Sequence, residues 1–205
     1  MKALHAILLS LTLTILSFAQ TEENDVKFGF GVSFSSEYTT YIYSEFEQGI
    51  QLQTLPIDMA NFSIIVKNNF LRLEPSFGYF TQSIDYNGGP YPAEYSYSNI
   101  RVGAVVAFNN TNIESMNFYY GIDFGFIFSN RNYTSSSSDE SDSKSKTDFF
   151  IGPAIGGEYL FIEHFSFGGE INLNYISMGQ YDSEMDISSW AMSTRGLIYL
   201  RWYVN

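Results

Sequence analysis

Large apolar residues alternate with glycine, small polar or charged residues along several stretches of this chain. In residues 27–35, KFGFGVSFS, phenylalanine and valine take the even positions, while lysine, glycine and serine take the odd ones. Because successive side chains of a strand point to opposite faces, this pattern gives one bulky apolar face and one small polar face. Charged residues of other stretches keep to the small face, as Arg72, Asp123 and Glu158 do. The pattern therefore indicates a β-sheet that separates two different environments.

The connections between the expected strands alternate between long and short. The short ones include tight turns at 68–69 and 162–164, whereas residues 130–147, rich in serine and acid, lack apolar anchors and predict a mobile loop. This order predicts an all-β fold, an eight-stranded antiparallel up-and-down transmembrane β-barrel with short periplasmic turns and long extracellular loops. We expect strands at 26–36, 60–67, 70–84, 95–108, 117–129, 148–161, 165–176 and 190–204. The second strand is short for a span, and Asp58 would break the parity if the strand began before it.

The first residues have the pattern of a secretory signal peptide. Lys2 precedes an apolar run from Ala6 to Phe18, and Ser17 and Ala19 are the small residues of a cleavage site. A retained membrane helix is the alternative, but the run is shorter than about 20 apolar residues. We therefore expect residues 1–19 to be a signal peptide and residues 20–205 to form one barrel domain.

Parity alone does not say which face of the sheet lies inside. A soluble lipocalin-like barrel would turn the apolar face inward. That face is crowded with phenylalanine, tyrosine and tryptophan, whereas the interior of an eight-stranded barrel is only just wide enough for side chains to fill it. The volume argument favours an integral outer-membrane protein whose apolar face contacts lipid.

Composition excludes some classes of partner and of chemistry. The chain has 22 acidic residues against 10 Lys and Arg, a net charge of −12, so its overall field does not attract nucleic acid. It contains no cysteine, which excludes disulfides and thiolate metal sites. Outer-membrane lipid is the expected environment, and we expect a monomer.

Charged residues on the inward face form the main candidate site. Their positive and negative charges nearly balance, and charges inside a narrow barrel are tolerated when they are paired. The pattern predicts a lumen plugged by salt bridges, and an ion or proton path along the same groups is the alternative. The candidate residues are Lys27, Lys67, Arg72, Glu74, Arg101, Asp123, Glu158, Glu170 and Arg201.

Catalytic, metal and cofactor sites find little support in the sequence. Beyond the signal peptide the single histidine is His164, which we place in a periplasmic turn, away from a substrate at the cell surface. The acidic groups at 139–142 and 182–186 lack the spacing of a calcium loop. We therefore predict no catalytic residues, no metal ligands and no cofactor, and a protein that is not an enzyme.

The expected extracellular loops combine acidic residues with tyrosine. Such a surface suits polar recognition of an extracellular ligand or surface partner, although tyrosines at strand ends also form the aromatic girdle of a barrel. The acidic residues are Glu37, Glu45, Glu47, Asp85, Glu94, Asp139, Glu140, Asp142, Asp182, Glu184 and Asp186, and the tyrosines are Tyr38, Tyr41, Tyr43, Tyr86, Tyr91 and Tyr181.

The segments SFAQ, FLRLEPSFGYF, FFIGPAIGGEY, FSFGGEINLNY and GLIYLRWYV carry a resemblance to a known family. The chain resembles the porin-like outer-membrane β-barrels of Gram-negative bacteria, of the small OmpA and OmpX type. It departs from them by ending in Val204-Asn205 rather than on an aromatic residue. Pro75 and Pro153 also lie within expected strands, where we expect β-bulges.

Two functions are consistent with this reading. The first is a structural or surface-binding protein that acts through its loops, and the alternative is a channel for small or apolar solutes. A lumen packed by Glu170, Tyr199, Arg201 and Tyr203 would favour the first, and a continuous water-filled passage would favour the second.

Overall fold

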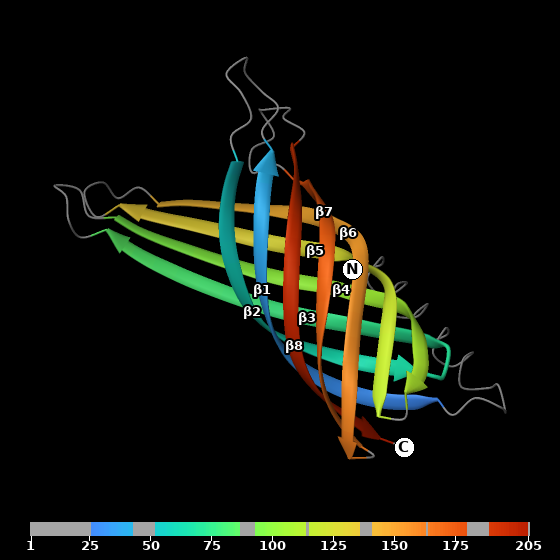
Figure 1. Cartoon of the computed structure of the whole chain (residues 1–205). Coiled ribbons are helices and arrows are strands. Elements are labelled where there is room, and N and C mark those ends of the chain that lie inside the picture. The colour runs from blue at the N-terminus through green and yellow to red at the C-terminus, as the bar shows by residue number, and fades with distance from the viewer. Residues whose placement is uncertain are drawn as a thin grey trace, which may run out of the picture.

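The computed structural model describes residues 26–42, 52–86, 93–113, 115–135, 141–162, 164–179 and 189–204. Eight antiparallel strands form a closed barrel in which each strand pairs with its neighbours in sequence and β1 pairs with β8 (Figure 1). The strands are β1 (Lys27–Ile42), β2 (Leu52–Lys67), β3 (Leu71–Tyr86), β4 (Ala93–Ile113), β5 (Met116–Ser135), β6 (Ser141–Ile162), β7 (Phe165–Met178) and β8 (Ser189–Val204).

All eight expected strands are present, and most of them extend further than the apolar pattern does. The second strand, expected over eight residues, has 16 and begins at Leu52. Asp58 therefore lies within β2, where it is exposed and faces outward. As its parity indicated, it is an exception to the rule that charged residues face inward. The expected short turns are confirmed, and after Lys67 the Asn68 side-chain oxygen accepts hydrogen bonds from the amides of Phe70 (2.9 Å) and Leu71 (2.6 Å).

The two faces of the barrel have the predicted orientation. On β7, Ile171 is 61% exposed, whereas its neighbour Asn172 is fully buried. Outward positions carry large exposed apolar side chains on every strand, and inward positions carry small, polar and charged ones. Inward glycines make room for the larger inward side chains: a Cβ added at Gly29 would lie 2.8 Å from the ring of Tyr203. The apolar face is therefore the outside of the barrel.

The two mid-strand prolines do not produce the expected bulges, so that expectation is wrong. On both sides of Pro75 the β2–β3 pairing keeps the same register, and the same holds for Pro153 between β6 and β7. Instead, the pairing is interrupted beside each proline, because proline has no backbone N–H to donate. Register shifts occur at Asn110/Ile113 and Leu160/Ile162, next to short turns.

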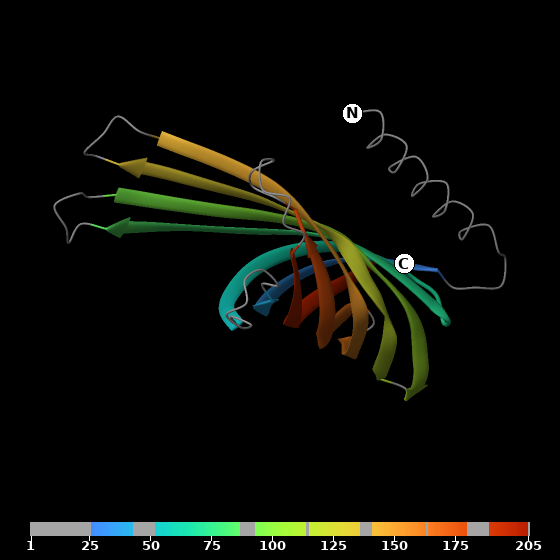
Figure 2. The same ribbon diagram turned by 90° about the horizontal axis from the view of Figure 1, so that it is seen from above.

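The outer half of the barrel divides into two four-stranded parts at the two seams that contain these prolines. Among the described residues, β2–β3 pairing stops at Ala60↔Tyr79, although β3–β4 pairing continues to Tyr86↔Ala93. Pairing between β6 and β7 stops at Phe149↔Ser177, although β5–β6 pairing continues to Thr134↔Ser141. The outer parts of β3, β4, β5 and β6 therefore project together, away from those of β1, β2, β7 and β8 (Figures 1 and 2).

The expectation of a mobile loop over residues 130–147 is wrong for most of that segment. Residues 130–135 belong to β5 and residues 141–147 to β6, and they pair from Asn130↔Ser145 to Thr134↔Ser141. The segment buries no apolar core, but backbone pairing needs none. Cross-strand polar contacts add to it, since the Ser143 hydroxyl lies 2.7 Å from the Asn132 side-chain oxygen.

Several expectations concern residues outside the described ranges. They include the signal peptide at 1–19, the loop at 87–92 and the acidic residues Asp139, Glu140, Asp182, Glu184 and Asp186. Within the ranges that are described, no helix has the length and apolar character needed to cross a bilayer.

Candidate functional site: the polar network of the lumen

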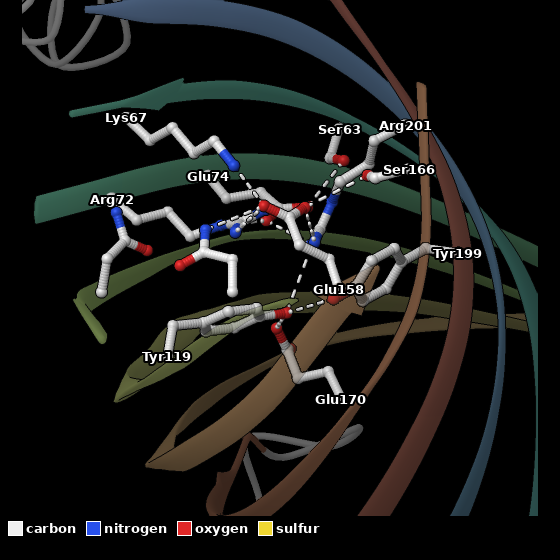
Figure 3. A network of polar contacts seen from close by, with 12 residues as sticks. Ser63, Lys67, Arg72, Glu74, Tyr119, Glu158, Ser166, Glu170, Tyr199 and Arg201 are labelled. Carbon is white, nitrogen blue, oxygen red and sulfur yellow. Dashed lines mark hydrogen bonds and ion pairs between the residues drawn. The ribbon is translucent and has the colours of Figure 1, made fainter. Parts of the chain in front are cut away.

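Glu158 of β6 is the centre of a polar network in the inner half of the lumen, which we call the inner cluster (Figure 3). Its carboxylate pairs with Lys67 of β2 and lies 3.4 Å from both Arg72 of β3 and Arg201 of β8. It also accepts hydrogen bonds from three neutral groups, namely Asn117 of β5 (3.0 Å), Ser166 of β7 (3.2 Å) and Tyr203 of β8 (2.6 Å). One buried carboxylate thus connects six strands of the barrel.

Glu74 of β3 is the second acid of the inner cluster. It pairs with Arg72 at 3.1 Å and with Arg201 at 2.5 Å, and it accepts a hydrogen bond from Ser63 at 2.8 Å. The guanidinium of Arg201 also stacks on the ring of Tyr199, 3.3 Å from its centroid. Charge, hydrogen bonding and stacking therefore hold the same arginine, and they compensate the cost of burying it.

Glu170 of β7, one of the charges predicted to close the lumen by salt bridges, is held differently from Glu74 and Glu158. Arg201 pairs with Glu74 and Glu158 rather than with Glu170, and within the described residues Glu170 makes no ion pair. Its carboxylate instead accepts a hydrogen bond from the Tyr119 hydroxyl at 2.7 Å, and Arg201 donates to that hydroxyl at 3.4 Å. Glu170 thus reaches the cations of the inner cluster only through a tyrosine.

A second network, the outer cluster, lies further along the lumen around Asp123 of β5. Asp123 pairs with Arg101 of β4 at 3.0 Å and accepts a hydrogen bond from Asn172 of β7 at 2.8 Å. Arg101 also pairs with Glu37 of β1 at 3.0 Å and lies 3.6 Å from the ring centroid of Phe150. The four strands that supply these polar groups belong to both parts of the divided barrel.

The structure corrects the predicted site at three residues. Lys27 is half-buried at the start of β1 and, in the described part of the chain, joins neither cluster. Glu37, expected in an extracellular loop, is 3% exposed inside β1, where Ser193 donates to it at 2.6 Å. Arg195 of β8 is 2% exposed and hydrogen-bonds to Asn61 at 2.7 Å. The other eight predicted residues are buried in the two clusters.

The missed residues had a sequence signal. Glu37 and Arg195 both have inward parity, and they are paired across β1 and β8. Extending the first strand beyond Ser36 would have placed Glu37 in the lumen. Buried asparagines such as Asn99 and Asn174 also have inward parity, but an uncharged amide did not mark them as members of a charged site.

The two clusters can block the lumen of the barrel, and the outer half of the lumen holds a small cavity. A cavity between Glu37, Tyr97, Ile127, Asp148 and Met178 has a volume of about 30 Å³, enough for about one water molecule. Several buried side-chain oxygens of the lumen accept no hydrogen bond from the protein, namely that of Asn99, which lines this cavity, and those of Asn172 and Asn174. Isolated waters fit this setting better than a continuous passage does.

Groups for other chemistry do not come together in the described part of the chain. His164 lies in the β6–β7 turn, as predicted, and its backbone oxygen accepts a hydrogen bond from the Tyr203 amide at 2.7 Å. No group of three or more His, Cys, Asp and Glu residues suited to a metal ion occurs among the described residues. Among the described residues the network consists of ion pairs and hydrogen-bonded polar groups.

The closed sheet, its polar interior and its apolar exterior together define a membrane-spanning β-barrel. No protein-family model matches the sequence, and no curated protein matches it. The crystal structure of Ail, the attachment invasion locus protein of Yersinia pestis, in complex with the heparin analogue sucrose octasulfate, is similar with a TM-score of 0.54 and 13% identity, covering 87% of this chain and 99% of that chain.

Two further structures are similar at lower scores. Another crystal structure of Yersinia pestis Ail has a TM-score of 0.49 and 13% identity, covering 87% of this chain and 98% of that chain. Neisserial surface protein A has a TM-score of 0.48 and 13% identity, covering 84% of this chain and 96% of that chain. The similarity to Ail at a TM-score of 0.54 shows the fold, that of a small β-barrel, and the apolar exterior of this barrel is a surface suited to lipid.

Proposed function

We propose that the protein is a non-conducting, non-enzymatic outer-membrane barrel that binds extended peptide segments at the cell surface. The main observation in support is the free edge of β3. Beyond Tyr79, β3 has no partner strand on its β2 side among the described residues, while β4 remains paired with it on the other side. A supported strand with an open edge can accept a further strand by backbone hydrogen bonds.

The amides available at this edge follow from the geometry of a strand. Backbone groups of successive residues point alternately to the two neighbouring strands. The pairing with β2 is interrupted beside Pro75, whereas the pairing with β4 is continuous there. The backbone nitrogen of Pro75 therefore faces β2. Thr81 and Ser83 have the same parity, so their amides point to the unoccupied side. Their side chains are exposed.

A partner for this edge is an extended peptide without strong negative charge. The chain has a net charge of −12, which disfavours a polyanion. The Ail structure holds a heparin analogue, but a ligand of that kind would be repelled by the field of this chain. Backbone pairing sets the affinity, and side chains alternating along the peptide provide specificity.

Replacement of Ser83 by proline is expected to abolish peptide binding and leave the barrel intact. Proline removes the amide that points to the open edge of β3 and leaves every hydrogen bond to β4 in place. The matched control, Ser83→Val, keeps the amide. Binding would be measured for both variants on an array of immobilised twelve-residue peptides, with hydrogen exchange of the Thr81 and Ser83 amides as a second readout. Equal binding by Ser83→Pro and Ser83→Val would disprove the assignment to this edge.

The closed lumen predicts little or no steady conductance in a planar bilayer. Both clusters lie across the lumen, and their buried charged groups are held by ion pairs or hydrogen bonds. Single-channel recording of the purified protein tests this. Large, stable currents whose ion preference changes in Glu170→Gln would contradict a closed lumen and support solute transport instead.

A further inference from the structure

A long groove crosses the outer surface of the barrel from β5 to β2. Its volume is about 940 Å³, and its lining is almost entirely apolar. Two neighbouring rows of outward residues form most of it, each row following the strand register. The residues between the rows, which have inward parity, also line it; they are Ser35, Met59, Gly156, Glu170 and Leu197. The first row is Ile155, Ile171, Gly196, Ser36 and Asp58, and the second is Phe118, Gly157, Gly169, Ile198, Phe34 and Ala60.

Small residues form the floor of the groove at two neighbouring places, one in each row. Gly157 and Gly169 are paired on β6 and β7, and Gly196 and Ser36 are paired on β8 and β1. A Cβ added at Gly196 would meet no atom within 4 Å, so the space above it is open.

Large side chains stand on both sides of this floor. Ile155 and Ile171 flank the glycines of β6 and β7 in one row, and Ile198 and Phe34 flank Gly196 and Ser36 in the other. Phe34 is 74% exposed and Ile155 is 66% exposed. The result is a narrow trough, one side chain deep, which suits a linear hydrocarbon chain.

One end of the groove has a carboxylate. Asp58 faces outward, is exposed, and makes no hydrogen bond or ion pair within the described residues. It lies beside Ser36 in the same row, above the apolar residues Ala60 and Phe62 of β2. A charged group on the lipid face of a barrel is unfavourable unless it lies near the interface or has a partner.

We infer that the groove binds one acyl chain of an amine-headed phospholipid, whose ammonium group donates to Asp58. The apolar trough excludes a polar chain, and an anionic head group alone would be repelled by the carboxylate. An ammonium group supplies both the charge and the hydrogen-bond donors that Asp58 lacks. This lipid site lies on the membrane face, separate from the β3 edge.

Native mass spectrometry tests the site on the full barrel refolded with equimolar phosphatidylethanolamine and phosphatidylglycerol of identical acyl chains. The unaltered protein should retain one lipid and prefer phosphatidylethanolamine by about tenfold, as one charge-assisted hydrogen bond allows. Gly196→Leu should lose the retained lipid, because the leucine fills the floor. The control Ala104→Leu places a leucine at an outward position of another strand, β4, and should retain the lipid.

Asp58→Asn tests the recognition of the head group separately from the binding of the acyl chain. It should keep the retained lipid but lose the preference between the two head groups. Retention by Gly196→Leu equal to that of Ala104→Leu would overturn the groove as the binding site. A preference unchanged in Asp58→Asn would overturn the role of the carboxylate.

Discussion

Replacement of Glu158 by glutamine is expected to lower the free energy of unfolding of the barrel by about 3 to 5 kcal/mol. The variant removes the negative charge that faces three buried cations, Lys67, Arg72 and Arg201. Removing one partner of a buried pair costs more than the pair itself contributes, because the remaining charge stays buried without compensation. Glu74 then still pairs with Arg72 and Arg201, but Lys67 loses the only acidic partner that it has among the described residues. Urea unfolding of the barrel in lipid vesicles measures the loss.

Glu170→Gln provides the matched control on the next strand. Glu170 accepts one hydrogen bond, from Tyr119, and an amide oxygen can accept the same bond. We expect a loss of about 1 kcal/mol. A second variant, Lys67→Met combined with Glu158→Gln, should recover part of the stability, because it removes one of the stranded cations. Equal losses in the two single variants would show that the inner cluster does not depend on the pairing of Glu158.

The strand order and the inward charges were predictable because alternation is a local property of the sequence. A single parity rule placed Arg72, Asp123 and Glu158 inside the barrel, where the structure has them. The same rule placed Ile171 outside. Both assignments could be made without knowing which strands are neighbours or how their residues are paired.

The strand ends and the particular ion pairs could not be predicted in this way. Beyond the lipid belt the apolar side of the alternation disappears, so β1 and β2 extend past the residues that the pattern marks. The pairing of Arg201 with Glu74 and Glu158 instead of Glu170 depends on which side chains meet across the lumen. That depends on register and strand tilt, which parity does not specify.

The projection of the outer parts of β3, β4, β5 and β6 could not be predicted for the same reason. Pro75 and Pro153 marked a disturbance of the ladder, but their sequence positions did not show which seam would be affected. The structure places both prolines on the seams where the two four-stranded parts separate. Pairing resumes beyond each proline and ends several residues further out, at Ala60↔Tyr79 and at Phe149↔Ser177, so the free edge of β3 begins on the same seam but not at the proline itself.

Replacement of Ile171 by arginine is expected to lower the free energy of folding into lipid by about 2 to 4 kcal/mol. Ile171 is at the centre of the outward apolar residues of β7, which run from Phe167 to Tyr175, so the cation would lie near the bilayer midplane.

The control for this variant is Ser177→Arg, on the same strand and the same face. Ser177 is exposed at the outer end of β7, where an arginine reaches the interface and costs about 0 to 1 kcal/mol. Refolding into vesicles of defined thickness measures both variants. The difference between them isolates the depth of the charge from the effect of an added arginine. If Ile171→Arg folded as stably as Ser177→Arg, the apolar face of the barrel would not be the face that contacts lipid.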